Sequence, residues 1–199
     1  TLLDALAGFL QISSGTLRMA GADHTRTAPA ERPVSLLFQD NNLFPRLTVF
    51  ENVALGLRPD LRISPKDKTD ITDILDQLDI AGLSTRLPRA ISGGQASRVA
   101  LARALLRDRP ILLLDEPFAA LGPALRVSLA GLLREAQRSR GLTSVVVTHQ
   151  PEDAARVADQ IVVVADGRAG EPVPVERLAN DPPPELAAYL GAWRAGGAH

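Results

Sequence analysis

Four short apolar runs stand out in the pattern of hydrophobic and polar positions along the chain. They cover Val34–Phe38, Ile111–Asp115, Ser144–Thr148 and Ile161–Ala165. Continuous apolar runs of this length are typical of strands that are buried on both faces of a parallel sheet. Because helical patterns alternate with these runs, the sequence predicts an α/β fold with a mainly parallel sheet.

The pattern between the first two runs is mostly helical. Thr48 and Glu51 form a capping box, which predicts a helix from Val49 towards Leu57. Ser64, followed by proline, predicts the start of a second helix. Its apolar positions recur at helical spacing and its aspartates fall largely off that stripe. These positions are Ile71, Ile74, Leu75 and Leu78, with Asp70, Asp73, Asp76 and Asp79.

The end of the chain has a different pattern. Asp166-Gly167 predicts a turn after the last apolar run. The tail after Asn180 contains a run of prolines and a pair of glycines, so we expect a partly ordered end there.

Composition excludes several classes of protein. With 45% hydrophobic residues the 199-residue chain can build a globular core, and its apolar runs are far shorter than the ~18 residues of a spanning helix. With a net charge of -1, the chain lacks the excess of basic residues that is typical of nucleic-acid-binding proteins. The chain has no cysteine, which excludes disulfides and thiolate metal sites, and its three histidines are scattered.

Ser92-Gly93-Gly94 precedes a predicted helix over Gln95–Arg107. Glycines allow close approach of a ligand to the backbone, and free N–H groups at a helix N-terminus favour an anion. Taken alone, the tripeptide also suits an ordinary turn.

Asp115 and Glu116 follow the apolar run that begins at Ile111. Two adjacent carboxylates at the end of a buried strand repel one another, so their placement indicates a task such as metal binding or base catalysis. The alternative is that both simply lie where a strand leaves the sheet.

Two single residues also follow apolar runs. His149 comes after the run that ends at Thr148, at the strand end where ligands bind in open α/β sheets. Gln39 follows Val34–Phe38 and offers both a carbonyl and an amide. Each could equally be a structural or solvated residue.

Taken together, three motifs resemble those of ATP-binding-cassette (ABC) ATPases over nearly the whole chain. They are ISGGQ at Ile91–Gln95, ILLLDEP at Ile111–Pro117 and VVVTH ending at His149. The resemblance implies a RecA-like P-loop NTPase core, ATP as ligand, and a homodimer with nucleotides at its interface. It also implies that the signature segment contacts the γ-phosphate held by the other subunit. That segment is Ser92, Gly93, Gly94 and Gln95.

The same resemblance assigns the chemistry. Asp115 and Gln39 are expected to hold Mg²⁺, and Glu116 to act as the general base on the attacking water. His149 is expected to contact the γ-phosphate and that water.

One required motif is absent: no G-x-x-x-x-G-K-[ST] loop occurs in the chain. The opening Thr1–Phe9 resembles the helix that directly follows that loop in ABC ATPases. We therefore expect the phosphate loop to lie upstream of residue 1, and the chain without it to be inactive.

The motifs depart from the family pattern in a few places. Ile91 replaces the usual Leu, and Ala96 and Ser97 stand where polar residues are common. Gly122 stands where the family usually has an aspartate that reaches across the dimer. The last departure affects coupling between subunits rather than bond cleavage.

A finer resemblance is to the ATPase subunits of bacterial thiamine importers. It rests on Arg32–Phe44, with Asn41-Asn42-Leu43-Phe44 the most discriminating part, and on Val162–Arg168. It implies a membrane permease as direct partner, a periplasmic solute-binding protein as indirect partner, and a peripheral location on the cytoplasmic face of the inner membrane.

The resemblance also predicts the organisation of the chain. We expect a first core part at 1–42, a helical subdomain at 43–90, the signature helix with the second core part at 91–179, and a tail at 180–199. In the subdomain, Leu43, Phe44, Leu47 and Phe50 are expected to be exposed and to carry the permease docking surface. The alternative is local core packing against Ile74 and Leu78, which is as well supported as docking for Phe50 and less so for Phe44.

Three other functions remain open at this level. One is a soluble, non-transport ABC protein acting on ribosomes or DNA, which the balanced charge and single cassette disfavour. Another is a non-catalytic subunit of the same fold, favoured by Gly122 and the missing phosphate loop and opposed by Glu116 and His149. The third is an importer ATPase for a different small solute.

Overall fold

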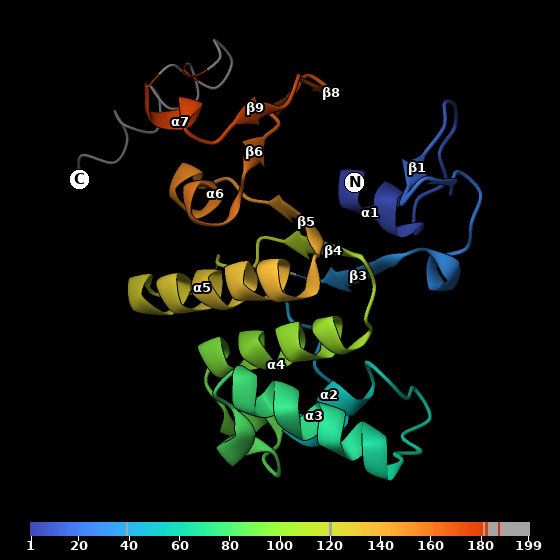
Figure 1. Cartoon of the computed structure of the whole chain (residues 1–199), viewed down its shortest axis with the longest axis vertical. Coiled ribbons are helices and arrows are strands. Elements are labelled where there is room, and N and C mark those ends of the chain that lie inside the picture. The colour runs from blue at the N-terminus through green and yellow to red at the C-terminus, as the bar shows by residue number, and fades with distance from the viewer. Residues whose placement is uncertain (39, 120, 181, 183–186, 188–199) are drawn as a thin grey trace. The chain divides into compact units, whose positions relative to one another are not determined.

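A computed structural model describes residues 1–38, 40–119, 121–180, 182 and 187 (Figure 1). The expected partly ordered tail after Asn180 lies almost entirely outside the described residues. The chain divides into two compact units, Thr1–Val147 and Thr148–His199.

A parallel sheet organises the first unit. Its strands are β3 (Val34–Leu37), β4 (Ile111–Asp115) and β5 (Thr143–Val147), in the order β3-β4-β5. Both pairings are parallel, with Leu114 of β4 opposite Leu37 on one side and Val146 on the other. Three of the four predicted apolar runs therefore form strands of one parallel sheet, and the predicted α/β fold is confirmed.

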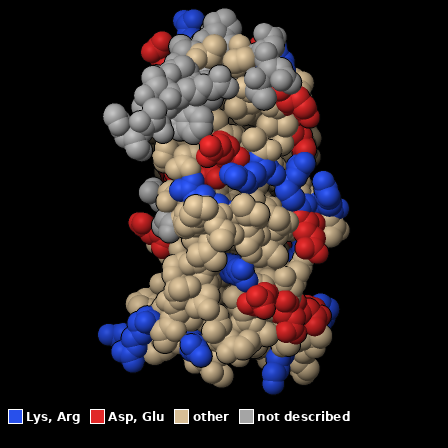
Figure 2. All heavy atoms as spheres, turned by 90° about the vertical axis from the view of Figure 1, so that its left-hand side faces the viewer, with Lys and Arg blue, Asp and Glu red and all other residues tan. Residues whose placement is uncertain are grey.

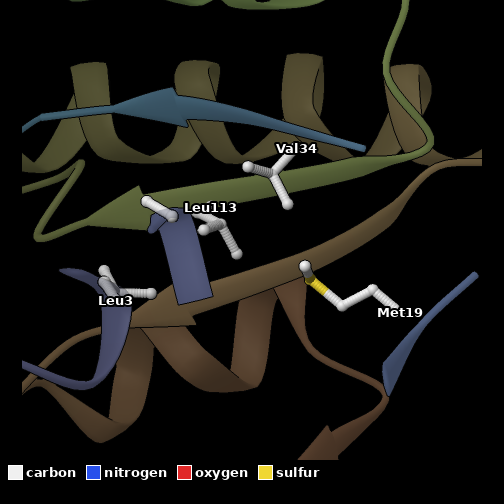
Figure 3. Close-up of a cluster of buried hydrophobic side chains, with 5 residues drawn as sticks. Leu3, Met19, Val34 and Leu113 are labelled. Carbon is white, nitrogen blue, oxygen red and sulfur yellow. The ribbon is translucent and has the colours of Figure 1, made fainter. Parts of the chain in front are cut away.

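One face of this sheet packs against the start of the chain. Helix α1 (Leu2–Ala7) lies above the strands in Figure 1, and a hairpin of β1 (Arg18–Met19) and β2 (Ala22–Asp23) follows it. Figure 3 shows Leu3, Met19, Val34 and Leu113 pointing towards one another from α1, β1, β3 and β4. A short 3-10 turn, η1 (Pro29–Glu31), leads into β3.

The other face of the sheet is covered by α4 (Gly93–Leu106), which contacts β3. In Figure 1 α4 lies below the strands, and α2 (Val49–Ala54) and α3 (Pro65–Gln77) lie below α4. Because α4 is packed on both sides, most of its residues are buried. Helix α5 (Pro123–Arg140) packs beside it. Two 3-10 turns, η2 (Ala81–Leu83) and η3 (Pro88–Ala90), precede α4.

The predicted helix starts are confirmed in detail. Thr48 caps α2 through a capping box with Glu51, and Ser64 caps α3 through a capping box with Asp67. Two predicted ends differ. Helix α2 stops at Ala54 rather than running towards Leu57, and Gly56 follows, where a Cβ would lie 2.4 Å from a backbone oxygen of α4. Helix α4 starts at Gly93 rather than Gln95.

The predicted apolar stripe of α3 is also confirmed. Its four members are at most 2% exposed: Ile71, Ile74, Leu75 and Leu78. The acidic Asp67 lies close to this core, paired with Arg58 at 2.9 Å. The Arg58 guanidinium and the Ser64 backbone N–H hold the pKa of Asp67 well below its usual range.

The prediction for β5 was only half right. The strand exists, but its residues are exposed or half-buried rather than buried on both faces, and Val147 is 37% exposed. The physical reason is the cover on its faces: α1 and α4 both contact β3, the other edge strand, whereas the main contacts of β5 among the described elements are with β4.

The prediction of a fourth parallel strand, which falls in the second unit, is wrong. Ile161–Ala165 does not join the parallel sheet. It divides into β6 (Gln160–Ile161), which pairs antiparallel with β9 (Val173–Pro174), and β7 (Val164–Ala165), which pairs antiparallel with β8 (Arg168–Ala169). Val162 and Val164 are exposed.

The turn within this region matches its prediction. Asp166 and Gly167 have φ values of 49° and 72° and connect β7 to β8. Two positive φ values in succession suit the tight turns of two-residue hairpins, and they explain why the run folds back instead of continuing. The unit also contains α6 (Pro151–Val157) and α7 (Arg177–Asn180).

Two further observations concern the distribution of charge and the hydropathy of the helices. Figure 2 shows acidic and basic side chains interspersed on one face of the molecule, in keeping with the balanced charge. Within the described part of the chain, no helix is long and apolar enough to cross a bilayer.

Candidate functional site

The start of α4 offers backbone donors to an anion. Ser92 is the N-cap: its Oγ accepts from the Gln95 backbone N–H at 3.3 Å, and Gln95 Oε1 accepts from the Ser92 N–H at 2.9 Å. This reciprocal box fixes the first turn of a long helix, whose dipole favours negative charge at that end.

The two glycines of this segment differ in their surroundings. A Cβ at Gly94 would lie 2.7 Å from Leu125 Cδ1 of α5, so a larger residue here would have to displace the exposed end of the Leu125 side chain. A Cβ at Gly93 would meet nothing within 4 Å, and Gly93 is exposed. The protein's own packing therefore does not explain Gly93, which leaves room for a ligand beside the backbone.

The paired carboxylates lie at the carboxyl edge of the sheet. Asp115 is the last residue of β4 and lies opposite Val147 of β5. The Glu116 backbone N–H donates to the Val147 carbonyl oxygen at 3.0 Å, after which Glu116 adopts φ 47°. A left-handed backbone in a non-glycine residue is uncommon and is found more often at functional sites. Parallel sheets bind ligands at this edge.

These residues fit Mg²⁺ in kind, because Mg²⁺ takes hard oxygen ligands and few of them from protein. Asp115 supplies a carboxylate of that type. Within the described residues no group of three or more His, Cys, Asp or Glu side chains is placed to hold a metal. Gln39, the other predicted metal ligand, lies outside the described residues.

His149 belongs to the second unit and is exposed. It lines a cavity of about 440 Å³ within that unit. Asp115 and Glu116 belong to the first unit, so the structure does not bring His149 and the carboxylates together within one unit. The cavity is lined by Thr148, His149, Gln150, Pro151, Ala154, Ile161, Val162, Val163, Val164, Ala165 and Leu178.

Two side chains that sequence reasoning missed hold the loop after β3. Arg103 of α4 and Asn52 of α2 hold its backbone carbonyls. A signal existed for Arg103, since it is a charged residue inside the otherwise apolar stretch Val99–Leu106. Of the predicted exposed residues in this loop and α2, Phe44 is 53% exposed, whereas Leu43, Leu47 and Phe50 are half-buried.

The fold and these motifs define a nucleotide-binding α/β domain with a helical layer beside its sheet. Comparison with known proteins gives the family. Residues 1–119 match the model described as ABC transporter. The chain therefore belongs to the ABC transporter family.

Several relatives are similar over most of the chain. A thiamine import ATP-binding protein ThiQ of Cereibacter sphaeroides is 53% identical over 191 residues, which is 96% of this chain and 83% of that protein. Proteins of the same name from Ruegeria sp. and Salmonella typhimurium are 46% and 54% identical, covering 96% and 84% of this chain and 83% and 72% of their own length.

Proposed function

We propose that this chain is the ATP-binding part of an importer ATPase that drives uptake of thiamine or thiamine phosphate through a membrane permease. The observation that carries this proposal is the 53% identity to a thiamine import ATP-binding protein over 96% of the chain. In this proposal it acts as a homodimer, peripheral to the cytoplasmic face of the inner membrane, with a periplasmic binding protein as indirect partner.

The proposed site residues divide the work of phosphoryl transfer. Ser92, Gly93, Gly94 and Gln95 present the N-terminus of α4 to the γ-phosphate of ATP, where backbone N–H groups and the helix dipole stabilise negative charge. The open space beside Gly93 supports this role.

The carboxylates supply the metal site and the base. Asp115 and Gln39 would hold Mg²⁺, which when bound neutralises charge on the phosphate oxygens. Glu116 accepts the proton of the attacking water, and His149 orients that water against the γ-phosphate. The position of Asp115 at the end of β4, with Glu116 directly after it, supports this assignment.

We also propose the division of the chain into core parts at 1–42 and 91–179, a helical subdomain at 43–90, and a tail at 180–199. Two observations support the subdomain: α2 and α3 lie on the side of α4 away from the sheet, and Phe44 is exposed at its start (Figure 1). This surface would receive the permease.

A chimera tests the function. This chain would replace the matching 191 residues of the Cereibacter sphaeroides relative, co-expressed with that organism's permease, and thiamine uptake and ATP hydrolysis would be measured in one reconstituted system. The chimera should hydrolyse ATP and transport thiamine. Because Glu116→Gln removes the general base, it should slow hydrolysis by ~10²–10⁴-fold while ATP still binds.

Controls make the result decisive. The 199-residue chain alone contains no phosphate loop and should show no ATP binding at millimolar concentration by calorimetry. A chimera that hydrolyses ATP but transports no thiamine would disprove the substrate. Hydrolysis within threefold of the parent in the Glu116→Gln variant would rule out the role of Glu116.

A further inference from the structure

The loop after β3 contains an unusual turn. Asn41 and Asn42 are consecutive residues with φ values of 57° and 44°. A single left-handed residue is tolerated by asparagine, but two in succession without glycine are strained and persist only when their surroundings enforce them. The turn is closed by the Asn41 N–H donating to the Phe38 oxygen at 3.0 Å and the Asn42 N–H donating to the Asp40 oxygen at 2.7 Å.

One side chain, Arg103 of α4, contacts both strained residues. Its Nη2 donates to the Asn41 carbonyl oxygen at 2.8 Å and its Nη1 to the Asn42 carbonyl oxygen at 2.8 Å. The planar guanidinium carries two donors at fixed spacing, which a lysine ammonium does not reproduce. Burial lowers the pKa of Arg103, so placing this cation here has an energetic cost that the two carbonyls offset.

A second side chain holds the following part of the loop. Asn52 of α2 is fully buried. Its Nδ2 donates to the carbonyl oxygens of Phe44, Leu47 and Thr48 at 3.1, 2.9 and 3.0 Å, and its Oδ1 accepts from the Phe44 N–H at 2.7 Å. Phe44 therefore has a fixed backbone but a ring that is 53% exposed.

The two holding residues belong to one packed body. A Cβ at Gly56, just after α2, would lie 2.4 Å from the Arg103 carbonyl oxygen, so the end of α2 and the last turn of α4 are in close backbone contact. A displacement of α4 thus moves both holders together. The N-terminus of the same helix carries Ser92 and Gly93.

We propose that Arg103 is a positioning residue that transmits the position of α4 to the loop carrying Phe44, and so links the nucleotide end of that helix to the permease-docking surface. This inference rests on the proposed function, which assigns the start of α4 to the nucleotide and the surface around Phe44 to the permease. The clamp itself, Arg103 on the Asn41–Asn42 turn, is testable without it.

The first test measures amide hydrogen exchange by NMR in the 199-residue chain. Arg103→Lys keeps the charge and loses the fork, so exchange of the Asn41 and Asn42 amides should rise roughly tenfold, the effect of losing about one hydrogen bond. Amides inside α4 should stay within twofold of the parent. Arg107→Lys, at an exposed position just beyond α4, is the matched control and should change neither set.

A rescue variant separates positioning from packing. Glycine adopts φ 44° without strain, so Asn42→Gly added to Arg103→Lys should bring exchange of the Asn41 amide back to within about threefold of the parent. Equal loss of protection in the turn and in α4, no change in the turn, or no rescue by glycine would each overturn the clamp.

A measurement on the unsubstituted protein covers the case in which Arg103→Lys does not fold. The Nη groups of Arg103 should give separate, slowly exchanging signals, whereas those of Arg107 average. Averaged Arg103 signals would overturn the clamp.

The functional half is tested in the chimera. Arg103→Lys should reduce thiamine transported per ATP hydrolysed roughly tenfold, with hydrolysis and the KM for ATP within twofold of the parent. Parallel loss of transport and hydrolysis would overturn the transmission role. Failure of the parent chimera to transport would instead disprove the proposed function, and the exchange experiments would still decide the clamp.

Discussion

Apolar side chains are buried in the helical layer around α4 but partly exposed in the edge strand β5. Val99, Leu101 and Leu105 of α4 are at most 3% exposed, because the sheet lies on one side of the helix and α2 and α3 on the other. The equally apolar β5 pairs with β4 alone among the described strands, and Val147 is 37% exposed. An apolar run thus predicts the element, while its burial depends on which neighbours the chain supplies.

The largest expected loss of stability comes from a substitution in the tightly packed helix α4. Leu101→Ala should destabilise the chain by about 2–5 kcal/mol, because it removes a side chain that is 1% exposed and leaves a cavity in α4's packing. Val147→Ala on the β5 edge should cost less than about 1 kcal/mol. Urea unfolding of both variants measures the difference. Similar costs would mean that β5 is packed as tightly as α4.

What the sequence could predict follows the same division. The capped starts of α2 and α3, the α3 stripe and the strands at β3 and β4 were predictable because their signals are local and their neighbours lie within the first unit. The run Ile161–Ala165 was not, since its length and composition do not distinguish a buried parallel strand from two short antiparallel ones.

The candidate site divides similarly. Ser92, Gly93, Asp115 and Glu116 could be found from sequence, because motif spacing places them at a helix start and a strand end. The contacts of Arg103 could not, since they join residues 61 and 62 positions apart in the chain. No local pattern specifies which distant carbonyls a half-buried arginine will contact.

A second, smaller effect concerns the acidic cap in the helical layer. Because the folded-state pKa of Asp67 is depressed below its ordinary value of 3.8, its stabilising contribution is present above that pH and is lost as pH falls through the folded pKa. The Tm should therefore decline between roughly pH 5 and pH 2. Asp67→Asn should lower the Tm at pH 7 and flatten this decline.

The matched control is Asp73→Asn, at an exposed position on the same helix, which should keep the Tm at pH 7 and the slope of the parent. A decline that is equally steep in the Asp67→Asn variant would show that other carboxylates cause it. Differential scanning calorimetry over the pH series gives both quantities.

The smallest effect on stability is expected where the site meets solvent, at Gly93. Its added Cβ would contact nothing, and alanine is the better helix former, so Gly93→Ala should leave stability unchanged or raise it by up to about 1 kcal/mol. Gly131→Ala, in the middle of α5 and equally uncrowded, is the matched control for that propensity gain.

The two variants should differ in activity when each is placed in the chimera. In the Gly93→Ala variant the added methyl group occupies space that the phosphate is proposed to approach. ATP hydrolysis and thiamine uptake should therefore fall at least roughly tenfold, as when one preorganised donor is lost. Gly131→Ala should keep both activities. Full activity in the Gly93→Ala variant would mean that the open space beside Gly93 serves no ligand, and the assignment of this helix start to the γ-phosphate would fail.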